Sequence, residues 1–238
     1  MMKRIFLETK RVVEFREALS VVEDMEKGQP GLMVVWGQPG RGKTECAREY
    51  AVRTGACYIR VMEDWTPRGM LAAICSSING MEPHTKERAK KIICEELEAN
   101  NLTILVDEAD RLKINLIEHL RDIHDLTGAP VVLIGEPELY ATVSARPRIL
   151  SRVTKTVEFG PVITEDVLLL GMKAADLKIE PEAAGALAAR AKGDFRTVWL
   201  DLRDMERLAR ANKINAVTLD HVNALPARKK GPTGGRRK

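Results

Sequence analysis

The stretch "LMVVWGQPGRGKT" (residues 32–44) decides how this 238-residue chain folds. Five apolar residues, which suit a buried strand, lead into the octet "GQPGRGKT" (37–44), and the amphipathic segment "TECAREYAVR" overlaps its end. The octet matches the pattern G-x-x-x-x-G-K-[ST], which is specific when it lies between a strand and a helix. The sequence therefore predicts a phosphate-binding loop at the end of a buried strand.

The residue types of this octet suit a polyphosphate ligand. Gly40 and Gly42 allow backbone N–H groups to turn toward a phosphate at the positive end of the following helix. Lys43 is expected to reach the β- and γ-phosphates, and the hydroxyl of Thr44 to bind Mg²⁺. We expect ATP to be bound by the whole loop: Gly37, Gln38, Pro39, Gly40, Arg41, Gly42, Lys43 and Thr44.

An acidic motif follows the third apolar run of the chain. "LTILVDEAD" (102–110) is typical of a buried strand, and it ends in the adjacent carboxylates Asp107 and Glu108. The carboxyl ends of parallel strands lie at one edge of a sheet, beside the phosphate loop. We therefore expect Asp107 to hold Mg²⁺ together with Thr44. Glu108 is placed to act as the general base that activates the attacking water.

Short apolar runs alternate with longer amphipathic segments up to residue 160. This alternation indicates βαβ units and predicts an α/β fold, with a parallel five-stranded sheet flanked by helices. The predicted strands are residues 31–37, 57–62, 102–108, 129–136 and 154–160. The predicted helices between them are residues 42–54, 67–79, 84–100, 114–127 and 137–150.

The pattern changes at Pro161, after which only helical periodicity is found. The predicted helices are residues 164–176, 181–192, 194–212 and 218–224, which would form a small all-α lid. The sequence thus predicts a nucleotide-binding domain (1–160), a helical lid (161–225) and a basic, disordered tail (226–238).

The net charge of +4 comes from the tail. The last twelve residues, "ARKKGPTGGRRK", hold six basic and no acidic side chains, so residues 1–226 carry 32 basic against 34 acidic side chains. The start of the chain, "MMKRIFLETK", lacks the apolar run of a signal peptide. No apolar stretch approaches the roughly 20 residues of a membrane helix. We therefore expect a cytoplasmic protein without a membrane partner.

Several classes of protein use a phosphate loop, and the chain lacks the guanine-reading N-K-x-D motif of GTPases. Residues 5–224 resemble the AAA+ ATPases. The resemblance is carried by "GQPGRGKT", "LVDEAD", "VVLIGE", "ARPRILSRV" (145–153) and "GDFR" (193–196). It implies an ATPase that uses ATP and Mg²⁺ and hydrolyses ATP slowly until it assembles.

The same resemblance assigns roles to arginines outside the phosphate loop. In AAA+ proteins an arginine late in the α/β domain reaches the nucleotide of the neighbouring subunit. Ser151-Arg152 matches that motif best, and Arg148 is the alternative. Arg196 resembles the lid arginine that senses the γ-phosphate. One position departs from the pattern: Glu136 stands where a neutral polar residue is usual, and an ionised acid there would repel the γ-phosphate. Either hydrolysis is slow or another residue takes over the sensor role.

Within the AAA+ proteins, the compact layout resembles the transposition-ATPase group, which includes phage Mu transposition protein B, TnsC and, more distantly, IstB. This resemblance implies a protein that forms a ring or helical filament of its own copies on duplex DNA. It also implies selection of target DNA and recruitment and activation of a transposase. The segment "FLETKRVVEF" resembles one that lies near adenine in that group, so Thr9 and Val12 are candidate base contacts.

Loops after the second and third strands line the pore of AAA+ assemblies. In this chain those loops are "EDWTPRG" (63–69) and "ADRLKIN" (109–115), so the candidate DNA contacts are Arg68, Arg111 and Lys113. Two alternatives remain open. One is a secretion ATPase of the ExeA type, and the other is an ATP-dependent switch that loads a helicase or initiator.

Overall fold

The computed structural model of the chain describes residues 2–3 and 5–226. It divides into two compact units, each with its own core. The first is Glu8–Pro161, and the second combines Val162–Lys238 with Met1–Leu7. The predicted tail lies outside the described residues except for Pro226.

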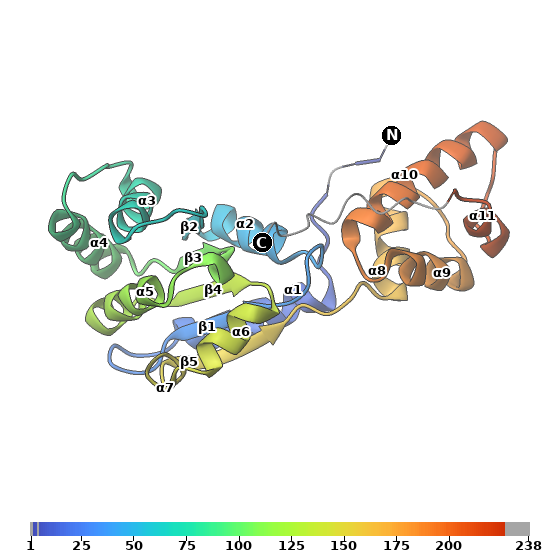
Figure 1. The fold of residues 1–238 in the computed structure, drawn as a ribbon. Helices are drawn as coiled ribbons and strands as arrows, with labels where there is room; N and C mark the ends of the chain where they lie inside the picture. Colours follow the sequence, from blue (N-terminus) through green and yellow to red (C-terminus); the bar gives the residue numbers. More distant parts are fainter. Residues whose placement is uncertain (1, 4, 227–238) are drawn as a thin grey trace. The chain divides into compact units, whose positions relative to one another are not determined.

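The first unit is built on a five-stranded sheet in the order β2-β3-β4-β1-β5, in which every neighbouring pair is parallel (Figure 1). This confirms the predicted α/β fold with a parallel sheet. The order places β4 between β1 and β3, so the carboxyl ends of these three strands form one edge. The strands are β1 (Leu32–Trp36), β2 (Cys57–Arg60), β3 (Ile104–Asp107), β4 (Val131–Gly135) and β5 (Val153–Glu158).

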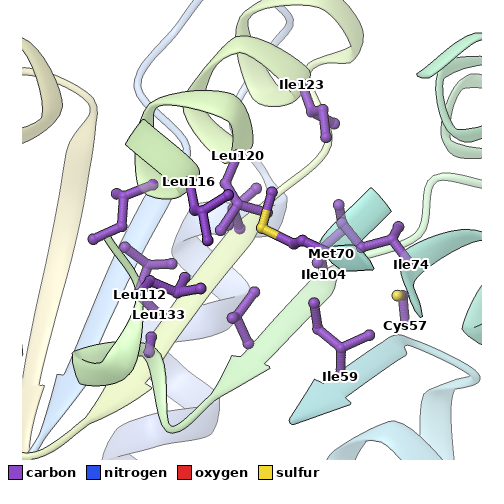
Figure 2. Close-up of a cluster of buried hydrophobic side chains, with 14 of the residues drawn as sticks. Cys57, Ile59, Met70, Ile74, Ile104, Leu112, Leu116, Leu120, Ile123 and Leu133 are labelled. Carbon is purple, nitrogen blue, oxygen red and sulfur yellow. The ribbon is translucent and has the colours of Figure 1, made fainter. Parts of the chain in front are cut away.

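Helices cover both faces of the sheet because its central strands are apolar on both sides. In β1, Leu32 and Val34 belong to the larger buried cluster, whereas Met33 and Val35 face the other way. Figure 2 shows the larger cluster, where helices α3 and α5 meet the sheet. The helices of this unit are α1 (Lys10–Glu23), α2 (Lys43–Thr54), α3 (Pro67–Asn79), α4 (Lys86–Asn100), α5 (Ile114–Thr127), α6 (Pro137–Ser144) and α7 (Pro147–Leu150), with a 3₁₀ turn η1 (Ala109–Arg111).

Local sequence explains most of these helix boundaries. Thr66 and Thr85 accept hydrogen bonds from the backbone N–H groups of Gly69 and Arg88, and so cap α3 and α4. The helix predicted over residues 137–150 is wrong as a single element, because it breaks between α6 and α7. Pro147 causes the break: the residue before a proline is disfavoured in helical conformation, and Arg146 is extended.

The second unit is helical, as predicted. Its elements are α8 (Thr164–Leu170), a π-helical turn η2 (Gly171–Ala175), α9 (Pro181–Ala191), α10 (Phe195–Asn212) and α11 (Leu219–Asn223). Residues 2–7 also belong to this unit, rather than to the α/β domain predicted over residues 1–160. Ile5 and Leu7 pack against the helical core, and the backbone N–H of Lys3 donates to the carbonyl of Ala174 at 2.7 Å. In the part of the chain that the structure places, no helix is both long and apolar enough to span a membrane.

Gly31, immediately before β1, provides a test of how tightly this core is packed. A Cβ atom on Gly31 would lie 2.5 Å from Cε1 of His124, whose ring is buried and contacts the carbonyl oxygens of Ala129 and Gln29. We expect Gly31→Ala to lower the free energy of unfolding by about 1–3 kcal/mol, measured by urea denaturation. Gly69→Ala is the matched control, because its nearest neighbour would lie 3.6 Å away. Equal stability of the two variants would contradict this account.

Candidate nucleotide-binding site

The octet forms a tight loop between β1 and α2. Gly40 and Gly42 have φ angles of +79° and +93°, a region that favours glycine, and Gly42 is the N-cap of α2. Gly37 is required for a different reason: a Cβ atom there would lie 2.4 Å from the carbonyl oxygen of Phe159, just after β5. The loop therefore ends at the amino end of α2, where backbone N–H groups are unsatisfied.

The side chains of the loop fit an anionic ligand. Nη1 of Arg41 is buried and has no hydrogen-bond partner among the described residues. The ammonium group of Lys43 donates to the carbonyl oxygens of Gly37 (2.5 Å) and Gln38 (3.1 Å), within the loop itself. Burial lowers the pKa of Lys43, while the nearby carboxylates of Glu136 and Asp107 oppose that shift. The triphosphate of ATP would satisfy both cations.

Asp107 lies at the carboxyl end of β3, as the acidic motif predicts, and is 2% exposed. The hydroxyl group of Tyr58, on β2, donates to Oδ2 of Asp107 at 2.7 Å. Burial and this hydrogen bond raise the pKa of Tyr58 to about 12. Asp107 Oδ1 accepts from the backbone N–H of Glu108 at 3.0 Å. The carboxylate is thus held in place and suits a cation bound between β3 and the loop, with the Thr44 hydroxyl the second candidate ligand.

Glu108 takes a left-handed backbone conformation, with φ of +59°, immediately after β3. Its carboxylate is paired with two arginines: Oε1 lies 3.0 Å from Nη2 of Arg60, and Oε2 lies 3.2 Å from Nη2 of Arg111. Activating a water would require Glu108 to leave at least one of these partners. Arg111, a candidate DNA contact, is therefore also a partner of the candidate base.

Glu136 follows β4 at the same edge of the sheet. Its backbone N–H donates to Oδ1 of Asp110 at 3.0 Å. Burial raises the pKa of the Glu136 carboxyl, and the negative charges of Asp110 and Glu138 raise it further. Glu136 is also the largest favourable charge acting on Lys43. The acid thus stands beside the phosphate loop, where its charge opposes an incoming phosphate.

The other candidate DNA contacts and base contacts are placed as follows. Arg68 lies in the first turn of α3 rather than in the preceding loop, and Lys113 is the N-cap residue of α5; both are exposed. Thr9 caps α1 and Val12 is buried in the sheet core, with 7% and 5% exposure. Their contact with adenine stays a prediction.

The three arginines assigned from motifs differ in their surroundings. Arg196 is exposed in the first turn of α10, in the helical unit, and its backbone N–H donates to Oδ1 of Asp194 at 2.8 Å. Arg152 precedes β5 and pairs with Asp125. Arg148 lies in α7 and is exposed. The sensing and trans roles of these arginines stay predictions.

Three residues of the site were missed by sequence reasoning: Tyr58, Arg60 and Asp110. Arg60 pairs in register with Asp107 on the neighbouring strand, which brings Arg60 and Glu108 together. The run "CYIRVM" marked a strand, but which strand it neighbours cannot be read from one sequence. Asp110 lies in "LVDEAD", but its partner, the backbone N–H of Glu136, follows β4, and no local pattern connects the two residues.

The first prediction from this geometry concerns hydrolysis. Glu108→Gln keeps the shape of the side chain and removes the basic carboxylate, so we expect ATP binding to persist and turnover to fall by about two to four decades. Lys43→Ala should abolish ATP binding itself. Binding by a fluorescent ATP analogue and steady-state phosphate release measure the two effects. An unchanged turnover rate in Glu108→Gln would remove this assignment.

The second prediction concerns the pH dependence of ATP affinity. Above its raised pKa, Glu136 is ionised and repels the triphosphate; below it, the carboxyl is neutral. Glu136→Gln should therefore bind ATP about threefold to tenfold more tightly near pH 8. The ratio of the two dissociation constants should approach one as the pH falls through this pKa. The protonation of ATP itself affects the wild type and Glu136→Gln equally at each pH. The ratio of their dissociation constants therefore reports the effect of the Glu136 carboxyl alone. A ratio that does not change with pH would contradict the prediction.

Comparison with known proteins agrees with this geometry. A family model described as "AAA domain" matches residues 26–143. The chain is 27% identical over 187 residues to "ATP-dependent target DNA activator B" of Escherichia phage Mu, covering 75% of this chain and 55% of that protein. It is 26% identical over 144 residues to "Mu-like prophage FluMu DNA transposition protein B" of Haemophilus influenzae, covering 58% and 50%.

Among solved structures, the Aeropyrum pernix ORC2 protein superposes with a TM-score of 0.67 at 16% identity, over 92% of this chain and 68% of that one. This likeness concerns the fold alone. The chain spans about half the length of the phage relatives that it matches. With its phosphate loop, its acidic motif and its five parallel strands, the chain has the fold of the AAA+ P-loop ATPases; residues 26–143 match the AAA domain, and the chain is similar to the transposition B proteins of Mu-like phages.

Proposed function

We propose that this chain is an ATP-dependent DNA-binding ATPase that assembles on duplex DNA, selects target DNA, and recruits and activates a transposase. The observation that carries this proposal is the likeness to the phage Mu target DNA activator, which covers 75% of this chain. The assembly would be a ring or helical filament of identical subunits, acting in the cytoplasm.

Roles in hydrolysis are proposed for residues at the carboxyl edge of the sheet and for two arginines elsewhere in the chain. Bound Mg²⁺ would neutralise phosphate charge, and Thr44 and Asp107 are the side chains placed to hold it. Glu108 acts on the attacking water, and Arg196 senses the γ-phosphate. Arg152 contributes charge to the nucleotide of the neighbouring subunit. Because Glu108 is paired with two arginines and Glu136 opposes phosphate binding, the isolated subunit hydrolyses ATP slowly.

DNA binding by this protein depends on locally arranged charges. Without the last twelve residues, acidic side chains outnumber basic ones by 34 to 32. Arg68 and Lys113 are exposed, and neither has an ion pair within the described chain. Side chains of this kind contact phosphates without reading sequence. Binding through a repeating assembly should therefore require ATP, tolerate any sequence and weaken steeply with salt.

The relatives favour this function over the two alternatives that the sequence left open. The printed names of the phage Mu and Haemophilus relatives concern target DNA and transposition. Neither secretion nor the loading of a helicase appears in them, and the likeness to an origin-recognition protein is one of fold. Electron microscopy of the protein with duplex DNA tests the central claim in three conditions: ATP, ADP and no nucleotide. Assemblies on DNA should form in the presence of ATP but not with ADP or without nucleotide.

A DNA-binding experiment separates the body of the protein from its tail. We expect a variant lacking residues 227–238 to keep ATP-dependent binding with reduced affinity. Arg68→Ala/Lys113→Ala should lose that binding, measured by fluorescence anisotropy at several salt concentrations. Lys86→Ala/Arg88→Ala is the matched control, because it removes the same two charges from the exposed start of α4.

The outcomes differ clearly. If truncation removes all binding while Arg68→Ala/Lys113→Ala binds normally, the assembly does not bind DNA through these loops. If Lys86→Ala/Arg88→Ala weakens binding as much as Arg68→Ala/Lys113→Ala, net charge rather than position decides affinity. Binding that is indifferent to nucleotide would contradict the proposed function itself.

A further inference from the structure

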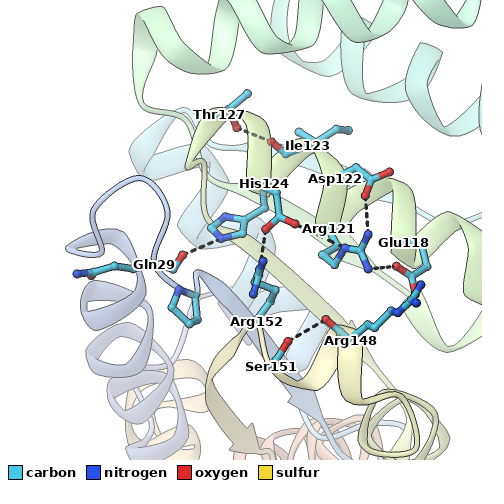
Figure 3. Close-up of polar contacts among 12 residues, drawn as sticks. Gln29, Glu118, Arg121, Asp122, Ile123, His124, Thr127, Arg148, Ser151 and Arg152 are labelled. Atoms are coloured by element: carbon cyan, nitrogen blue, oxygen red, sulfur yellow. Dashed lines mark hydrogen bonds and ion pairs between the residues drawn. The ribbon is translucent and has the colours of Figure 1, made fainter.

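Arg152 is held at three points of its own subunit. Its backbone N–H donates to the carbonyl of Ile149 at 2.9 Å, and its carbonyl accepts from the N–H of Leu32, in β1, at 2.8 Å. Its side chain extends to α5, where Nε donates to Oδ1 of Asp125 at 2.7 Å (Figure 3). The residue therefore links the start of β5 and the first residue of β1 to the end of α5.

The contact uses only one of the three guanidinium nitrogens. The two terminal nitrogens of Arg152 have no hydrogen bond or ion pair within the described residues, and the side chain is 41% exposed. A pair of terminal nitrogens is the part of an arginine that binds phosphate in two-point geometry. Holding the group through Nε thus fixes the direction of the side chain and leaves its phosphate-binding edge available.

Asp125 is itself held in place, by its buried neighbour His124 and by an ion pair with Arg121. The neighbouring His124 is 3% exposed, and its ring nitrogens contact the carbonyl oxygens of Ala129 (2.9 Å) and Gln29 (3.1 Å). Oδ2 of Asp125 lies 3.7 Å from Nε of Arg121, which also pairs with Asp122 and Glu118. Figure 3 shows these contacts gathered around the end of α5. Asp125 is therefore fixed on one side by the core and on the other by charge.

Arg148, the alternative trans arginine, has no such support. It lies in the short helix α7 and its side chain is exposed. Among residues 2–3 and 5–226, only its backbone carbonyl has a side-chain partner, the hydroxyl of Ser151 at 3.1 Å. A free arginine side chain loses about 2 kcal/mol of rotamer entropy when it is ordered. Arg152 has already lost part of that freedom, so it is the better prepared of the two arginines to bind a phosphate.

From these contacts we infer that Asp125 is a positioning residue for Arg152: it orders the guanidinium in advance, ready for the nucleotide of the neighbouring subunit. This inference rests on the proposed function, because it assumes that Arg152 acts in trans. Asp125 touches no nucleotide in this arrangement and acts only through Arg152. The ion pair is present in the single chain, so the ordering precedes assembly.

The experiment compares Asp125→Ala with Arg152→Ala and with the control Asp122→Ala. Asp122 lies on the same helix and pairs with Arg121 rather than with Arg152. We expect Asp125→Ala to lower the kcat of the assembled ATPase by about tenfold to a hundredfold, the usual effect of a small misplacement. The KM for ATP should not change, and neither should the affinity of the isolated Asp125→Ala subunit for ATP. Asp122→Ala should stay within about twofold of the wild type.

Mixing of subunits separates positioning from a general loss of structure. Glu108→Gln subunits cannot hydrolyse their own ATP, but each carries an intact Asp125–Arg152 pair. Mixed with Asp125→Ala subunits, they should restore hydrolysis at interfaces where they donate Arg152. An absence of restoration, or a loss of ATP binding in Asp125→Ala, would overturn the inference. The double variant Asp125→Ala/Arg152→Ala should be no slower than Arg152→Ala alone.

A second variant covers the possibility that Asp125→Ala does not fold. Asp125→Asn keeps an acceptor oxygen for Nε and removes the charge, so its kcat should lie between those of the wild type and Arg152→Ala. A kcat equal to the wild type's would overturn the role of the carboxylate. The failure of the wider proposal is distinct: if Arg152→Ala retains full assembly-stimulated hydrolysis, Arg152 is not the trans arginine, whatever Asp125 does.

Discussion

Four carboxylates at one edge of the sheet, those of Glu136, Asp107, Asp110 and Glu108, act on the ammonium group of Lys43 and oppose the lowering of its pKa by burial. The parallel order of β3, β4 and β1 brings these groups together, because every strand ends at this edge. One lysine of the phosphate loop thus lies near several carboxylates. A polyphosphate is expected to bind Lys43 and the loop, and a Mg²⁺ ion is expected to bind beside it at the carboxylates. The hydroxyl group of Tyr58 holds Asp107 in place, and ion pairs with Arg60 and Arg111 hold Glu108.

Strand β1 also connects the nucleotide site to Arg152, which lies next to β5. β1 ends in the phosphate loop and begins at Leu32, whose N–H donates to the carbonyl of Arg152. At its other end, Gly37 approaches the backbone of Phe159, just after β5, closely enough to exclude any side chain. The loop and the candidate trans arginine therefore stand on one rigid pair of strands. A displacement of β1 would move both the phosphate loop and Arg152.

Ion pairs in this protein hold functional candidates as well as surface side chains. Glu108 is paired with Arg60 and Arg111, Arg152 with Asp125, and Glu136 is held through its backbone by Asp110. In each case the partner comes from a different strand or helix, or from a turn several residues away. Arg111 belongs to both the candidate DNA surface and the candidate catalytic pair, so a phosphate that binds Arg111 competes with Glu108 for the same guanidinium.

The sequence by itself determined the α/β class, the five strands, the helical second unit, the phosphate loop and the Asp107–Glu108 motif. These features depend on local periodicity and on a pattern of fixed spacing, which one chain displays in full. The break before Pro147 was encoded locally as well, by the proline itself. Tertiary structure alone decided the place of residues 2–7 in the helical unit and the distant partners of Glu108 and Arg152. Arg152 and Asp125 are 27 residues apart in the sequence, and Glu108 and Arg60 are 48 residues apart. Such contacts follow from strand order and packing, and no local pattern encodes which distant charge a side chain will meet.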